Sequence, residues 1–157
     1  MTREEKFMKE AIKLSYLGLK NNEGGPFGCV VVKNDIIIGR GYNKVTGTND
    51  PTAHAEIVAI RDACKHLNTF QLEDCEIYTS CEPCPMCLGA IYWARPEVIY
   101  YANTRSDAAD IGFDDSMIYD EMNTHINKRK IPVINLGRSD AQKIFVEWLN
   151  KKDKTCY

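Results

Sequence analysis

Long hydrophobic runs are missing from this sequence of 157 residues. No stretch of about eighteen apolar residues occurs, so no membrane-spanning helix is expected. The opening segment, MTREEKFMKEAIKL, is charged and amphipathic and lacks the apolar centre of a secretory signal. Both absences argue against a membrane or secreted protein, and they predict a cytoplasmic location.

A strong excess of charge is missing as well, since the formal net charge is only -2 at pH 7. An extended basic surface is therefore not expected, and nucleic acid is not predicted as a partner. The apolar share of 44% and the charged share of 27% are ordinary for a globular protein. At this length they predict a single domain, residues 1–157, that can bury a core of its own.

Cysteine, in contrast, is plentiful: the chain has seven, which is an odd number. A disulfide framework is not expected without a secretory signal, because cytosolic thiols stay reduced. Four cysteines are scattered, and we interpret all but the last of them as small buried hydrophobic residues: Cys29, Cys64, Cys75 and Cys156. The other three form a cluster in which each is three positions from the next: Cys81, Cys84 and Cys87.

Changing hydrophobic periodicities predict a mixed sheet covered by helices. Thr2 and Glu5 form a capping box for the first helix, and Asn34-Asp35 is a tight turn between two strands within 27–43. Two later strands alternate with helices, which predicts right-handed crossovers and a largely parallel second half of the sheet. The later elements expected are strands 75–79 and 97–102, helices 53–66 and 84–94, two helical pieces within 105–122 with Asp114 capping the second, and helix 140–152 capped by Ser139. The predicted fold class is α/β.

The cysteine cluster and one histidine have the composition of a zinc site. Cys84 and Cys87 lie in the first turn of a predicted helix, where exposed N–H groups favour thiolates and both side chains can reach one ion. His54 begins the earlier helix and completes three ligands where helix N-termini meet the carboxyl ends of strands. Three protein ligands leave a fourth position for water, as in catalytic zinc sites. Glu56, two residues after His54, is placed to take a proton from that water.

Other interpretations of the same residues remain open at this point. A Cys-x-x-Cys pair can be a redox dithiol, or half of a structural zinc site with Cys81 or His66 as a fourth ligand. An iron–sulfur cluster would need another cysteine at matching spacing, which is missing. The complete string, His54-Ala55-Glu56 followed by Pro83-Cys84-x-x-Cys87, favours the catalytic interpretation because it is typical of zinc nucleobase deaminases.

On these motifs the chain resembles the cytidine deaminase-like superfamily and, over nearly its whole length, the small bacterial guanine deaminases. The stretches that carry the resemblance are GGPFG, NDPTAHAE, TSCEPCPMCLGAIYWARP and DAADIGFDDSMIY. The resemblance implies a three-layer α/β/α sandwich with a mixed central sheet, one zinc ion per subunit, and hydrolytic deamination of guanine to xanthine and ammonia. It also implies a homodimer in which a C-terminal segment, about 130–157, is exchanged between subunits.

The resemblance also assigns the residues of the site. Zinc is held by His54, Cys84 and Cys87, and Glu56 moves protons. The guanine pocket comprises a further set of residues, the last of them contributed by the partner subunit: Phe27, Asn43, Ala55, Trp93, Phe113, Asp115 and Tyr157. The side-chain chemistry suits a flat purine, because aromatic rings can clamp it, an amide can pair with its edge, and an ionised carboxylate accepts from its N–H groups.

Purely structural roles are alternatives for several of these residues. Phe27 and Trp93 would be core residues in many folds, and Asp115 would be a solvated neighbour of a helix cap. Two alternative functions also remain: a tRNA adenosine deaminase, which needs a basic groove, and a non-catalytic domain that zinc only stabilises.

Overall fold

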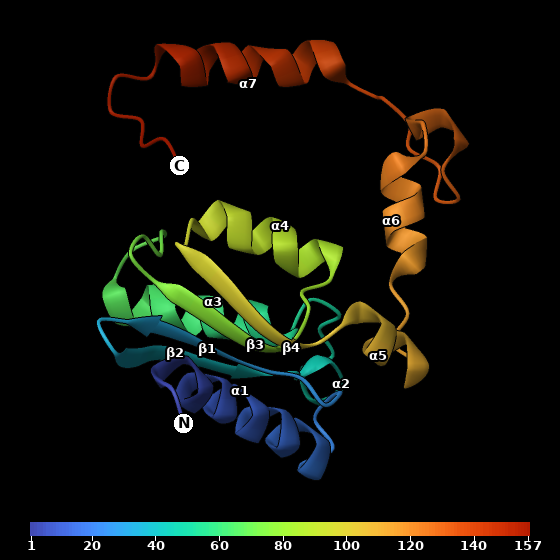
Figure 1. Cartoon of the computed structure of the whole chain (residues 1–157). Helices are drawn as coiled ribbons and strands as arrows, with labels where there is room; N and C mark the ends of the chain where they lie inside the picture. Colours follow the sequence, from blue (N-terminus) through green and yellow to red (C-terminus); the bar gives the residue numbers. More distant parts are fainter. The chain divides into compact units, whose positions relative to one another are not determined.

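A mixed sheet forms the centre of the first of two units, Met1–Asp115 and Ser116–Tyr157, in a computed structural model that describes residues 1–157 (Figure 1). Its strand order is β2-β1-β3-β4. The strands are β1 Gly28–Lys33, β2 Ile36–Tyr42, β3 Glu76–Cys81 and β4 Val98–Asn103. β1 pairs antiparallel with β2 and β3, whereas β3 and β4 are parallel. The predicted tight turn and the parallel second half of the sheet are both confirmed.

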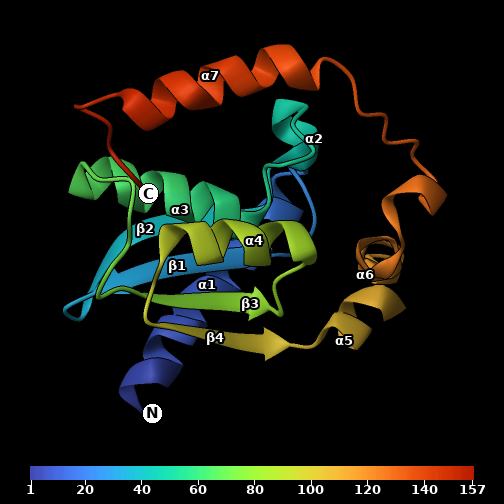
Figure 2. The same cartoon turned by 90° about the horizontal axis from the view of Figure 1, so that it is seen from above.

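Helices cover both faces of this sheet. The helix α1 (Arg3–Lys20) lies on one face, and α3 (Ala55–Leu67) and α4 (Pro85–Ala94) lie on the other (Figures 1 and 2). The Thr2–Glu5 capping box is present at the start of α1. The expected three-layer α/β/α arrangement is therefore confirmed, with boundaries within about two residues of those predicted. None of the helices combines the length and apolar character needed to cross a bilayer.

The core lies on both faces of the sheet, because β1 is buried on both sides. Cys29 and Val31 face the cluster formed with α3 and α4, whereas Val30 and Val32 face α1. Cys75 is also fully buried, as expected, whereas Cys64, for which the same was expected, is only partly buried. Successive residues of β1 point to opposite faces of the sheet, and both faces are buried. The sequence of the strand is therefore continuously apolar over 28–32 instead of alternating.

Two glycines of β2 bring α3 down onto the sheet. A Cβ atom at Gly39 would lie 2.5 Å from the Ala59 carbonyl oxygen, and one at Gly41 would lie 2.2 Å from that of Ala55. Only hydrogen fits at these two positions, so the helix backbone can contact the strand directly. The first turn of α3, which follows His54, is thereby fixed against the sheet.

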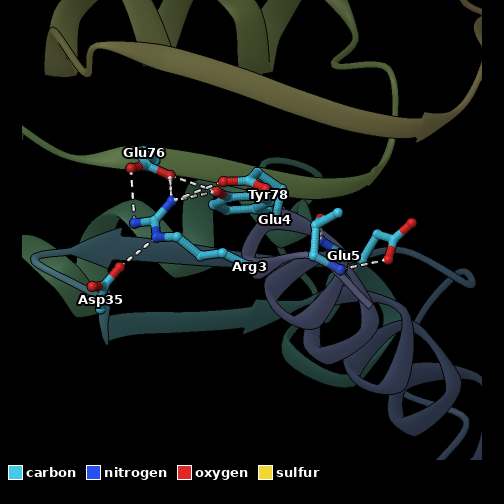
Figure 3. Close-up of polar contacts among 7 residues, drawn as sticks. Arg3, Glu4, Glu5, Asp35, Glu76 and Tyr78 are labelled. Carbon is cyan, nitrogen blue, oxygen red and sulfur yellow. Dashed lines mark hydrogen bonds and ion pairs between the residues drawn. The ribbon is translucent and has the colours of Figure 1, made fainter.

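An ionic network joins α1 to the sheet at the end opposite the cysteine cluster. The Arg3 guanidinium donates to both carboxylate oxygens of Glu76, at 2.9 and 3.0 Å, and also to Asp35 in the β1–β2 turn (Figure 3). The Tyr78 hydroxyl also donates to Glu76. The hydrogen bond from Arg3 holds the pKa of Glu76 below its usual value. Sequence patterns did not indicate this network.

The second unit, described by itself, contains α6 (Ser116–Asn123), a short 3-10 helix η1 (Ile126–Lys128) and α7 (Arg138–Asn150). The α6 helix begins at Ser116, and the capping role predicted for Asp114 stays a prediction. The other capping prediction is wrong. Gly137 is the N-cap of α7 with a left-handed φ of 72°, so the helix begins at Arg138 and Ser139 lies inside its first turn.

Candidate functional site

Two helix N-termini present the candidate metal ligands. His54 is the N-cap of α3 and Cys84 is the N-cap of α4, and neither side chain makes a capping hydrogen bond. Pro85 occupies the first turn of α4, where its missing N–H costs nothing, and Cys87 follows in the same turn. The side chains of the two N-caps are thus available to a ligand instead of to their own helices.

The three donor atoms converge at distances that suit zinc. The Nδ1 atom of His54 lies 3.6 Å from the Cys84 sulfur and 3.5 Å from the Cys87 sulfur, and all three donors lie within 4.8 Å of one another. A tetrahedral zinc ion with ordinary Zn–S and Zn–N bonds separates such N and S atoms by about 3.6 Å. The donors therefore fit this metal as they stand, and Nδ1 is the histidine nitrogen that faces the two sulfurs.

The donor group has no fourth protein ligand. Cys81 is buried, and its sulfur lies against the Thr104 carbonyl oxygen at 3.6 Å. His66 lies in the last turn of α3, whereas His54 precedes the first. The donor group contains only His54, Cys84 and Cys87. Neither of the residues considered for a closed structural zinc site is placed to complete one, so this arrangement favours an open position.

Glu56 lies in a buried position beside the two cysteines. Its side chain is 6% exposed; Oε1 accepts from the Thr79 hydroxyl at 3.3 Å, and Oε2 accepts from the Cys87 thiol at 3.4 Å. Burial raises the pKa of Glu56 above its ordinary value, and its hydrogen bonds oppose that shift only in part. A raised pKa makes this carboxylate a stronger base, which favours a role in general acid–base catalysis.

The pKa values of Cys84, Cys87 and His54 are shifted in different directions by their mutual contacts. The neighbouring side chains of Cys87 and His54 lower the pKa of Cys84, and the contact with Cys84 raises the pKa of His54. These shifts favour the thiolate form of Cys84, whereas the bond with Cys84 raises the pKa of Cys87. A preformed thiolate is a ready ligand for a soft divalent cation.

An amide and two aromatic rings lie in the loops of the same unit. Asn43 is 5% exposed, and its Oδ1 accepts from the Val45 N–H at 3.1 Å. Phe27 and Phe113 meet edge to face, with ring centroids 4.9 Å apart. A Cβ atom at Gly25 would lie within 2.9 Å of both rings, so the GGPFG loop packs tightly against this pair. Hydrogen at Gly25 allows that packing.

Comparison with known proteins agrees with this geometry. Residues 1–103 match the family described as the cytidine and deoxycytidylate deaminase zinc-binding region. The chain is 52% identical over 153 residues to guanine deaminase from Bacillus subtilis (strain 168), and this covers 98% of both chains.

The chain belongs to the zinc-binding deaminase family.

Solved structures of the same family place the fold more closely. The structure of the Bacillus subtilis guanine deaminase matches with a TM-score of 0.94 over 98% of both chains. The guanine deaminase from Nitrosomonas europaea matches at 33% identity with a TM-score of 0.66, over 69% of this chain and 63% of that one. A tRNA-specific adenosine deaminase from Buchnera aphidicola is 33% identical over 96% of both chains. The resemblance predicted from the motifs is thus confirmed.

The remaining residues that the deaminase resemblance assigned to a guanine pocket differ in their burial and in their distance from the donor group. Ala55 is fully buried between His54 and Glu56, and Asp115 is half-buried. Burial, followed by the negative charge of Cys84, raises the pKa of Asp115. Ala55 therefore lies at the donor group, whereas the role of Asp115 in a guanine pocket stays a prediction.

Trp93 is not brought to the donor group, and Tyr157 lies in the other unit. Trp93 is 62% exposed in the last turn of α4, about 14 Å along the helix axis from Cys84 at the usual rise per residue. Tyr157 belongs to the second unit and is 70% exposed. The roles given to both residues in a guanine pocket stay predictions.

Sequence reasoning did not consider Thr79, the hydrogen-bond partner of Glu56. The period of two along β3 was the available signal, because it places Thr79 on the same face as Ile77, which packs in the cluster with α3. A polar residue on that otherwise apolar face needs a buried partner, and Glu56 provides it.

Proposed function

We propose that the chain catalyses the hydrolytic deamination of guanine to xanthine and ammonia, with zinc held by His54, Cys84 and Cys87. The observation that supports the chemistry best is the buried carboxylate of Glu56 beside these three donors. The 52% identity with a guanine deaminase over 98% of the chain supports guanine as the substrate.

The chemistry needs a nucleophile at neutral pH and a group that moves protons. Zinc, when bound, supplies a Lewis acid that lowers the pKa of a coordinated water from about 15.7 to about 7. Glu56 takes a proton from the attacking water and delivers it to the ring nitrogen next to C2 of guanine. It then takes the second proton from the hydroxyl group now on C2 and passes it to the leaving amino group, so that the C2–N bond breaks, ammonia departs and a C2=O carbonyl remains. A C–O bond replaces the C–N bond, and no oxidant or reductant is needed.

Substrate recognition falls to the residues around this carboxylate. The Asn43 oxygen is engaged by Val45, which leaves its amide N–H groups to donate to a purine acceptor. Asp115 accepts from guanine N–H groups and meets ring acceptors in adenine, which disfavours that base. Phe27 and Phe113 supply an apolar wall, and the backbone N–H of Ala55 at the start of α3 adds a donor.

We further propose that the protein works as a homodimer that exchanges its C-terminal segment, about 130–157. Apolar residues of α7 support this proposal, because they are exposed and would be covered by a partner: Ile144, Phe145, Trp148 and Leu149. The outer edge of β4 also pairs with no other strand, and such edges accept an added strand. In this assembly Tyr157 of one subunit closes the site of the other. We also propose a role in purine catabolism in the cytoplasm. All seven cysteines are free thiols, which suits that reducing compartment.

Ammonia release from purified zinc-loaded protein tests the activity. Guanine, adenine, cytosine, cytidine, guanosine and a tRNA should be offered in parallel, with Glu56→Gln as the inactive control. Release from guanine alone is expected. Release from tRNA alone would identify an adenosine deaminase of the kind found among the relatives, and release from none would leave only a domain that zinc stabilises.

A further inference from the structure

Two consecutive residues at the end of β3 hold the backbone at the end of β4. The Glu82 N–H donates to the Asn103 carbonyl oxygen at 2.8 Å, and its carboxylate accepts from the Arg105 N–H at 3.0 Å. Between these two bonds, the Cys81 thiol donates to the Thr104 carbonyl oxygen at 3.6 Å. The backbone of residues 103–105 is therefore held by hydrogen bonds with two successive residues, Cys81 and Glu82.

The Glu82 carboxylate satisfies one of the N–H donors at the start of the following helix. Arg105 is the first residue of α5 (Arg105–Asp110), and its N–H is one of those that a helix leaves unpaired. Thr104 and Asp107 form a capping box that occupies the Asp107 and Thr104 N–H groups, at 3.2 and 2.8 Å. A hydrogen bond from an N–H to a carboxylate is stronger than one between neutral groups, and the helix dipole favours it further.

The two segments joined by this bond carry different parts of the proposed site. Glu82 is separated from Cys84 only by Pro83, whose ring restricts the backbone between them. On the other side, the Ala108 carbonyl oxygen of α5 accepts from the Phe113 N–H at 2.9 Å, and Asp115 follows two residues later. A displacement of α5 would move Phe113 and Asp115 relative to the metal ligands.

We propose that Glu82 is a positioning residue for substrate recognition, which fixes α5, and with it Phe113 and Asp115, against the loop that carries Cys84. The inference rests on the proposed function, since it assumes that those two residues contact guanine. Glu82 itself contacts neither the metal nor the substrate. Its effect is expected on the binding of guanine more than on the chemical step.

Three variants separate this role from a general structural one. Glu82→Ala removes the acceptor, Glu82→Gln keeps a neutral oxygen acceptor, and Glu97→Ala removes an exposed carboxylate at the opposite end of β4 as the matched control. In Glu82→Ala the KM for guanine should rise about tenfold or more, with kcat within about threefold and one zinc retained per chain. Glu82→Gln should recover most of the affinity, and Glu97→Ala should match the unaltered protein.

Amide hydrogen exchange at Arg105, resolved by NMR, provides a readout that does not depend on activity. Exchange should accelerate in Glu82→Ala and stay slow in Glu82→Gln. Faster exchange with an unchanged KM would overturn the proposal, and so would loss of zinc from both variants, which would show that Glu82 supports the metal loop. If Glu82→Ala does not fold, Glu82→Asp replaces it in the same comparison.

Failure of the proposed function looks different from failure of this inference. The unaltered protein would then release no ammonia from guanine, whatever residue occupies position 82. The bond to α5 would still be tested by exchange at Arg105, and equal exchange rates in the unaltered protein and in Glu82→Ala would reject it.

Discussion

The Oε2 atom of Glu56 lies 3.4 Å from the sulfur of Cys87, so the proposed proton carrier and one proposed metal ligand share a hydrogen bond. In this bond the thiol donates and the carboxylate accepts. A cysteine that binds zinc loses its proton and can no longer donate. Metal binding therefore releases one oxygen of Glu56, which becomes available to a water or a substrate in the same buried space.

Glu56→Gln should abolish most turnover while the fold and the zinc content stay unchanged. The amide cannot carry a proton between water and guanine, although it fills the same volume and can still bond to Thr79. We expect kcat to fall by about 10²–10⁴-fold. Ammonia release and elemental analysis of the same sample check this, and full activity in the variant would remove Glu56 from the mechanism.

Cys84→Ala should lose zinc, whereas Cys81→Ser should keep it. Cys81 ends β3 and Cys84 caps α4 three residues later. Only the sulfur of Cys84 belongs to the donor group, while that of Cys81 lies against Thr104. A hydroxyl at position 81 can still donate to that carbonyl. Zinc per chain is measured by elemental analysis after gel filtration. An unchanged zinc content in Cys84→Ala would contradict the ligand assignment.

The chemistry of the site could be read from the sequence because its residues act locally. His54 and Glu56 share one helix start, and Cys84 and Cys87 share another, so spacing alone brings each pair together. Zinc then restricts how the two helix starts meet. The parallel second half of the sheet followed from the alternation of strands and helices, which leaves few topologies.

Long-range polar contacts could not be read in the same way. Arg3 and Glu76 are 73 positions apart and belong to no periodic pattern, so their pairing depends on the tertiary fold. The start of α7 was misplaced because Ser139 is a good N-cap, while the left-handed Gly137 allows the helix to begin earlier. A cap predicted from residue type alone is wrong where the backbone conformation determines where the helix begins, as it does at Gly137.

Gly41→Ala should destabilise the protein far more than Gly89→Ala. The added Cβ at Gly41 would lie 2.2 Å from the Ala55 carbonyl oxygen, so α3 must move off the sheet. We expect a loss of about 3 kcal/mol or more in the free energy of unfolding. Gly89 lies inside α4 with open space around it, and alanine there should stabilise by up to about 1 kcal/mol. Urea unfolding of both variants measures the difference.

The stabilising effect of Glu76 should depend on pH. The hydrogen bond from Arg3 lowers the pKa of Glu76 in the folded state, so its contribution is present above the ordinary glutamate pKa of about 4.5 and is lost as pH falls through the lower folded value. Glu76→Gln should therefore lower the melting temperature by a few degrees at pH 7 and by less near pH 3. Equal shifts at both pH values would exclude the ion pair as the cause.

Complementation between two inactive chains should reveal the exchange of C-terminal segments. Glu56→Gln lacks the proton carrier, and Tyr157→Ala lacks the residue proposed to close the partner's site. In a heterodimer with exchange, Tyr157 from the first chain enters the site of the second, which still holds Glu56. Heterodimers purified through two different tags should therefore recover about half of the normal activity per dimer, since one of the two sites is complete. Without exchange no site contains both residues, so an inactive heterodimer of two correctly folded chains would reject the swap, and full activity in Tyr157→Ala alone would reject the role of that tyrosine.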